Sequence, residues 1–172
     1  MNQENDIILS RLAKLLEAES PHLMRYASYR LGNTENAKDA LQDVFLKMHS
    51  RLSENASPQV NDLRNYLFRT LSNLCTAKLC EQKKQNIVPL DEKFDKMETV
   101  TDDFESDFER ISMLLNHIPD EQAEVIRLRI YGNNSFAEVA DILSIPLPTV
   151  KSRFLYGVEK IRQGMKTIKS TI

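Results

Sequence analysis

The stretch of residues 135–157 constrains the fold most, because its pattern predicts two short helices joined by a tight turn. Ser135 and Glu138 have the spacing of a capping box, in which the hydroxyl and the carboxylate each accept a backbone N–H at the start of a helix. Pro146 and Pro148 follow, and a proline is tolerated in the first turn of a helix because its missing N–H would be unpaired there. The prolines therefore predict the end of one helix and the start of another.

The second of these predicted helices has an apolar back and a polar front. Its apolar residues recur at helical spacing: Val150, Phe154, Val158 and Ile161. Its polar face carries Lys151, Ser152, Arg153 and Tyr156. A helix that enters the major groove of DNA needs such a face of short basic and hydroxyl side chains. Because any helix pair with a solvated face shows the same pattern, both interpretations stay open from these residues alone.

Composition and motifs argue against several classes of protein. The chain has no run of about twenty apolar residues, so we expect no membrane insertion. Its N-terminus lacks the positive charge and cleavage site of a signal peptide, so we expect a cytoplasmic protein. Cys75 and Cys80 lie five residues apart, a spacing that suits neither a disulfide nor a zinc site, and we expect buried or half-buried free thiols. No Gly-rich phosphate loop, histidine pair or nucleophile motif indicates an enzyme, and we expect no metal, cofactor or catalytic residue.

The net charge of −2 hides a division of charge along the chain. Residues 1–84 carry a charge of +2, residues 85–108 carry −6, and residues 109–172 carry +2. Two mildly basic blocks are thus separated by an acidic stretch. Because nucleic-acid binding depends on the local patch rather than on the total charge, a near-neutral chain can still bind DNA.

The first half of the chain predicts amphipathic helices. The first helix has an apolar stripe, and Pro21, preceded by a serine, has the pattern of a second helix start, with Gly32 as a left-handed end. Thr34 is predicted to cap the helix with the strongest amphipathic pattern in the chain. Asp62 is predicted to cap a long helix that extends to residue 84.

The second half carries the first family resemblance. Residues 118–153 resemble the C-terminal promoter-reading domain of extracytoplasmic-function (ECF) RNA polymerase sigma factors, and the run Thr-Val-Lys-Ser-Arg at residues 149–153 is its most specific part. The resemblance implies that this domain reads the upstream (minus-thirty-five) promoter element. The implied contact residues are Pro148, Thr149, Lys151, Ser152, Arg153, Tyr156 and Lys160.

A second resemblance lies in the first half. Residues 36–47 are similar to the sigma-factor helix that docks on the clamp of core RNA polymerase. The family pattern there is Asp, then Gln with Asp or Glu, then Phe, and it matches Asp39, Gln42, Asp43 and Phe45. A solvated polar face is the alternative interpretation of these residues. The presence of both halves of the family in the expected order favours polymerase docking.

The long helix from residue 63 to 84 has a basic face. In the family, this helix and the loop before it capture bases of the melted downstream (minus-ten) element. The residues so implied are Arg64, Arg69, Asn73, Lys78, Lys83 and Lys84. Lysine and arginine neutralise phosphates, and an unstacked base needs an aromatic or amide neighbour. Tyr66 and Phe68 could serve as that neighbour, but for both we favour a place in the core.

The resemblance implies an all-α fold of two helical domains. Residues 1–84 would form a sigma region 2-like bundle of four helices, residues 85–106 an acidic linker, and residues 107–172 a sigma region 4-like helix-turn-helix domain. The implied partners are core RNA polymerase, promoter DNA and an anti-sigma factor. We expect the free chain to be a monomer.

Several positions depart from the family pattern. Asn73 is followed by cysteines where members often carry an Asp and an Arg, and Ser144 stands where the turn usually has glycine. Leu155 and Tyr156 replace basic residues, and Gly157 interrupts the recognition helix at a cost of roughly 1 kcal/mol relative to alanine. These departures leave promoter choice open and predict reduced DNA affinity as one outcome.

Two other functions remain as alternatives. A sigma-like chain with weakened DNA faces could act as an interaction module that titrates an anti-sigma factor. A polymerase-independent helix-turn-helix regulator would bind DNA stably without polymerase, usually as a dimer on a palindrome. No dimerisation heptad is visible in the sequence, and the polymerase-docking pattern would then have no explanation.

Overall fold

The structure is a computed structural model that describes residues 3–54, 62–85 and 103–170, with side chains from residue 107 onward in the last range. Three helices form the first half: α1 (Gln3–Leu31), α2 (Thr34–Ser53) and α3 (Leu63–Gln85). The second half holds α4 (Asp103–His117), α5 (Asp120–Ile126), the π-helical turn η2 (Arg127–Tyr131), α6 (Phe136–Leu143) and α7 (Leu147–Ser170). Within these ranges there is no strand, and the predicted all-α fold is confirmed.

Several local predictions hold. Ser135 and Glu138 form the complete capping box of α6. The Asp62 carboxylate accepts a hydrogen bond from the Asn65 backbone N–H at the start of α3. Gly32 has a φ of +71°, the left-handed conformation that ends a helix before a turn. Each of these signals depends only on residues close together in the chain.

Two predicted helix starts lie elsewhere. Pro21 lies inside α1, which is a single helix rather than two, so the first half holds three described helices and not four. Pro21 is exposed, whereas Leu12 and Leu23 on either side of it are buried in the same core, and this burial holds both halves of α1 against their neighbours. Asn33, rather than Thr34, caps α2 through its side chain.

The acidic stretch lies mostly outside the described residues. Residues 86–102 are not described. Helix α4 begins at Asp103, four residues before the helix start expected at Asp107 and inside the range predicted as linker.

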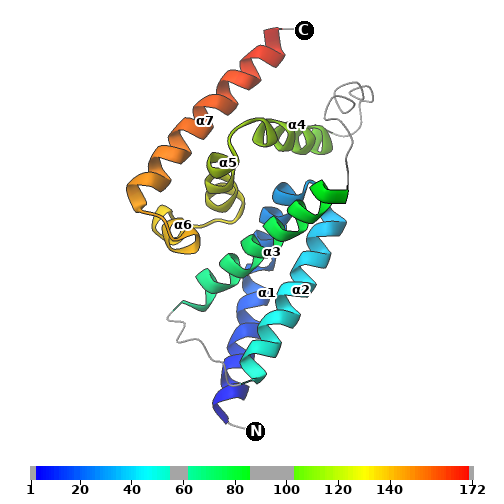
Figure 1. The fold of residues 1–172 in the computed structure, drawn as a ribbon, viewed down its shortest axis with the longest axis vertical. Helices are drawn as coiled ribbons and strands as arrows, with labels where there is room; N and C mark the ends of the chain where they lie inside the picture. Colours follow the sequence, from blue (N-terminus) through cyan, green and yellow to red (C-terminus); the bar gives the residue numbers. More distant parts are fainter. Residues whose placement is uncertain (1–2, 55–61, 86–102, 171–172) are drawn as a thin grey trace.

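The two halves of the chain share one hydrophobic core. Its buried residues include Tyr26 and Phe68 from the first half and Leu128, Val139 and Ile142 from the second. Helix α3 packs against α1, α2 and α6, and α1 packs directly against η2 (Figure 1). The helix-turn-helix therefore packs directly against the first half of the molecule.

Helix α7 approaches its neighbours closely at two glycines. A Cβ on Gly157 would lie 2.7 Å from Ile126 Cδ1 and 3.2 Å from Gln122 Cβ, both on α5. A Cβ on Gly164 would lie 2.8 Å from Leu114 Cδ2 on α4. The glycine that interrupts the predicted recognition helix thus allows α7 to pack on α5.

Candidate functional surfaces

Helix α2 presents an exposed face opposite its buried stripe. The buried stripe consists of Ala37, Ala40, Val44, Met48 and Leu52. The four residues predicted to bind polymerase, Asp39, Gln42, Asp43 and Phe45, are all exposed. Phe45 is 42% exposed and its neighbour Leu46 is 64% exposed. Sequence reasoning missed Leu46, although a leucine outside the helical core stripe was visible in the pattern.

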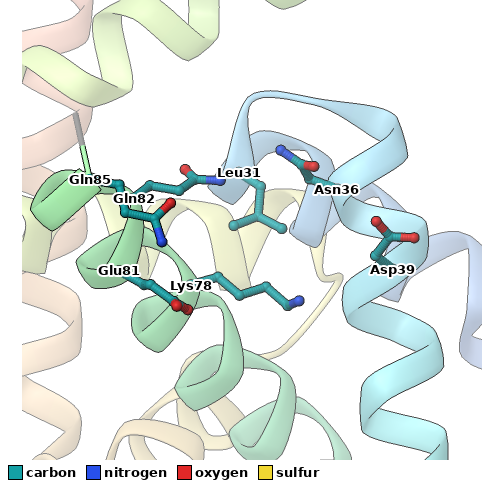
Figure 2. A pocket seen from close by; sticks show the side chains of 7 residues that line it. All are labelled: Leu31, Asn36, Asp39, Lys78, Glu81, Gln82 and Gln85. Atoms are coloured by element: carbon teal, nitrogen blue, oxygen red, sulfur yellow. The ribbon is translucent and has the colours of Figure 1, made fainter. Parts of the chain in front are cut away.

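One residue predicted to bind DNA, Lys78, forms an ion pair with this α2 face. Lys78 Nζ lies 2.9 Å from Asp43 Oδ2. Its pKa is raised, first by the hydrogen bond to Asp43 and also by the nearby charge of Asp39. Figure 2 shows the Lys78 amino group reaching from α3 toward α2 across a polar hollow, with Asp39 on its far side. Lys78 of α3 therefore borders the exposed face of α2.

The residues at the start of α7 are mostly open to solvent. Pro148, Lys151, Ser152, Tyr156 and Lys160 are exposed, and Thr149 is half-buried. Arg153 is also half-buried, and its guanidinium lies 3.3 Å from the Glu121 carboxylate on α5. All of these residues lie on α7. The Arg153 side chain points toward α5, which belongs to the same half of the chain as α7.

The two α3 arginines predicted to bind DNA contact the helix-turn-helix. Arg64 lies 3.5 Å from the Glu138 carboxylate and donates hydrogen bonds to the Asn134 side chain and the Asn133 carbonyl. Arg69 donates to the main-chain carbonyls of Asp141 and Ile142. The other three predicted residues of this face, Asn73, Lys83 and Lys84, are exposed.

A buried carboxylate joins the two halves, and sequence reasoning missed it. Glu124 on α5 accepts hydrogen bonds from the hydroxyls of Tyr26 and Ser72. Its Oε2 atom lies 3.2 Å from the Arg30 guanidinium and 3.8 Å from that of Arg127. The donors come from α1, α3 and η2, so no pattern within one segment could reveal the cluster.

The electrostatics of this cluster follow from burial and charge. Burial, followed by the charge of Glu124, raises the pKa of Tyr26 well above its usual value. Burial opposes the charge of Arg30, but Glu124 and Asp120 outweigh it and raise its pKa. Burial lowers the pKa of Arg127, whose side chain is 1% exposed. We call Glu124, Tyr26, Arg30, Ser72 and Arg127 the interdomain cluster.

Comparison with known proteins identifies the family. The Sigma-70 region 2 family model matches residues 15–85, and the Sigma-70 region 4 model matches residues 114–163. The chain belongs to the sigma-70 family of RNA polymerase sigma factors. It is 26% identical over 154 residues to the ECF RNA polymerase sigma factor SigW of Bacillus subtilis, covering 80% of each chain. The chain is therefore a sigma factor of the ECF type, a transcription regulator with a DNA-binding helix-turn-helix region.

Two solved structures share the fold. The sigma factor RpoE, in complex with the anti-sigma factor NepR from Bartonella quintana, aligns with a TM-score of 0.68 at 18% identity, covering 91% of this chain and 97% of that chain. CnrH, in complex with the cytosolic domain of CnrY, also has a TM-score of 0.68 at 18% identity, covering 90% of this chain and 87% of that one. The likeness thus includes both halves of the molecule.

The described residues hold neither a membrane-spanning helix nor a cluster of metal ligands. None of the helices in residues 3–54, 62–85 and 103–170 is long and apolar enough to span a membrane. In those same ranges, no group of three or more His, Cys, Asp or Glu side chains is placed to hold a metal ion.

Proposed function

We propose that this sigma factor docks on core RNA polymerase through the exposed face of α2. The observation that carries this proposal is the exposed apolar pair Phe45 and Leu46 beside Asp39, Gln42 and Asp43. An exposed apolar patch with polar neighbours is typical of a protein-binding surface. The opposite face of α2 is buried against α1 and α3, so the helix can present this patch rigidly.

Promoter reading is assigned to two other surfaces. The start of α7, with its exposed lysines, hydroxyl and Tyr156, suits contacts to the upstream element in the major groove. The basic face of α3 suits the phosphates and unstacked bases of the downstream element. Each surface is small, so each contact would be weak alone. Polymerase would join the two contacts into one effective site.

The chain would carry out no catalysis in this mechanism. It would position promoter DNA, while core polymerase performs the nucleotidyl transfer. Because polymerase and promoters lie in the cytoplasm, we place the action of the chain there.

We also propose an anti-sigma factor as a regulatory partner. RpoE, which shares this fold over most of the chain, is in complex with an anti-sigma factor. A partner that covers the α2 patch would compete directly with polymerase. The alternative function, titration of an anti-sigma factor without transcription, uses the same surface and differs only in whether polymerase binds.

The docking proposal is tested by co-purification with core polymerase. Asp43→Arg reverses an exposed charge on the proposed surface and also breaks the ion pair with Lys78. We expect the variant to lose retention on polymerase while its circular dichroism spectrum stays unchanged. Glu17→Arg is the matched control, because it makes the same charge change at an exposed position on α1. Equal retention of the Asp43→Arg variant and the wild type would overturn the docking surface.

A further inference from the structure

We propose that Lys78 on α3 is a positioning residue of the docking face, which holds the Asp43 carboxylate of α2 in the orientation that binds polymerase. The inference rests on the proposed function for one point, that Asp43 contacts core polymerase. It removes Lys78 from the residues expected to bind the downstream promoter element. The docking face of α2 then depends on a residue of α3.

The ion pair between Lys78 and Asp43 joins two neighbouring helices. Lys78 Nζ lies 2.9 Å from Asp43 Oδ2, within the range of a charge-assisted hydrogen bond. The side chain of Lys78 is 30% exposed and that of Asp43 is 49% exposed. The ammonium group is thus the more shielded partner, and the carboxylate keeps a surface on which a second molecule can bind.

The core fixes the backbone at each end of this pair. Asp43 follows the buried Ala40 by three positions and directly precedes the buried Val44. Lys78 follows the buried Cys75 by three positions, which is close to one helical turn. Because both side chains start from packed helices, the ammonium group can restrict the rotamers of Asp43. A side chain held in its binding rotamer before docking loses less conformational entropy when the partner binds.

The surroundings of Lys78 disfavour a DNA phosphate. Asp39 and Glu81 line the same polar hollow as Lys78 (Figure 2). Together with Asp43, three carboxylates thus lie around one ammonium group. A phosphate at this place would meet a net negative charge, whereas basic side chains of a protein partner would be attracted. We therefore expect the part of polymerase that docks here to present basic side chains.

Two opposite effects of Lys78 on docking can be separated by their sign. If the ammonium group only neutralised Asp43, its removal would strengthen the attraction to a basic partner. If it positions the carboxylate, its removal weakens binding, because Asp43 then samples several rotamers. We expect weaker binding, since water already screens the charges of this half-exposed pair, whereas the hydrogen bond fixes a direction.

A double-mutant cycle on polymerase binding tests the positioning role. The dissociation constant for core polymerase is measured for the full-length wild type, Lys78→Met, Asp43→Ala and the variant with both changes. We expect Lys78→Met to bind about fivefold to tenfold more weakly than the wild type. The double variant should bind no more weakly than Asp43→Ala alone, because Lys78 acts through Asp43. Lys78→Arg, which keeps a cation within reach of Asp43, should restore most of the lost affinity.

The control variant shows whether any lost positive charge weakens docking. Lys14→Met removes the same charge from an exposed lysine of α1 and should bind polymerase as the wild type does. Circular dichroism and urea unfolding check that every variant is folded. We expect Lys78→Met to stay folded, because its ion pair is partly exposed to solvent.

RNA synthesis at saturating polymerase separates docking from promoter contact. Once fully bound to polymerase, Lys78→Met should direct as much RNA synthesis on fragmented genomic DNA as the wild type. Less RNA at equal polymerase occupancy would make Lys78 a promoter contact and would overturn the inference.

The remaining outcomes distinguish this inference from the docking proposal. Unchanged or tighter binding by Lys78→Met would overturn the positioning role, and so would losses that multiply in the double variant. The docking surface would still stand in both cases if Asp43→Ala binds weakly. Equal binding by Asp43→Ala and the wild type would instead overturn the docking surface, and the positioning role with it.

Discussion

Glu124 on α5 is a buried residue whose carboxylate binds side chains of the first half of the chain. It is 7% exposed, and its carboxylate is surrounded by hydroxyl and guanidinium donors. A buried carboxylate of this kind is stable only while its partners remain, because each unpaired charge left behind keeps its desolvation cost. The spacing of α5 marks Glu124 as a helix residue, but its partner Tyr26 lies 98 positions away. Local reasoning therefore could not find it.

Removal of this carboxylate should destabilise the whole chain. In Glu124→Ala, the buried Arg30 and Arg127 lose their buried acidic partner and keep only Asp120, whose side chain is 70% exposed. We expect the free energy of unfolding in urea to fall by about 3–5 kcal/mol. In the control Glu159→Ala, which loses an exposed ion pair, we expect a change of about 0–1 kcal/mol. Similar unfolding curves for the two variants would contradict the role of Glu124.

The two cysteines should differ sharply in reactivity. Cys75 is buried, and burial, followed by the charge of Glu124, raises the pKa of its thiol to about 12. Cys80 is exposed. Because the thiolate is the reactive form, we expect one thiol per folded chain to react with a disulfide reagent at pH 8, and two after denaturation. Fast labelling of both thiols in the folded chain would show that Cys75 is more accessible than its packing indicates.

At the scale of elements, local signals predicted helix ends better than helix continuity. The capping box of Ser135 and the cap by Asp62 were both predicted from adjacent residues. The helix start predicted at Pro21 was wrong, because α1 continues through this residue. Burial of α1 on both sides of the proline outweighs the backbone hydrogen bond that proline cannot donate. Gly157 was predicted as a weak point of a helix, whereas the structure shows it at a close contact with α5. Whether a helix tolerates a proline or a glycine depends on the residues that pack against it, and these residues cannot be read from the local sequence.

The close approach of α7 to α5 at Gly157 predicts whether alanine at this position raises or lowers stability. Alanine would gain about 1 kcal/mol in helix propensity. Its Cβ would, however, meet both Ile126 and the Cβ of Gln122 on α5, and such overpacking costs about 1–3 kcal/mol. We expect Gly157→Ala to lower the melting temperature. Gly164→Ala is the matched control, since its Cβ meets only the end of the flexible Leu114 side chain, and it should be tolerated better. A higher melting temperature for Gly157→Ala would show that α7 does not need this close approach.

At the scale of the whole molecule, the family and the order of its two regions along the chain could be predicted from the sequence. Short patterns around Asp39 and Thr149 carry the resemblance, and their order along the chain is visible without a structure. The packing of the two halves could not be predicted, because it depends on pairs such as Arg64 with Glu138, 74 residues apart. Residues 86–102, which join the halves, lie outside the described ranges. How the chain closes is thus a property that only the three-dimensional contacts show.

The most direct test of the account is transcription by core polymerase with the purified chain on fragmented genomic DNA. The starts of the RNA products are then mapped. We expect starts at a defined set of sites that share an upstream and a downstream element at constant separation. These starts should be absent with core polymerase alone and with the Asp43→Arg variant. Starts that are the same with and without the folded wild-type chain would contradict the account.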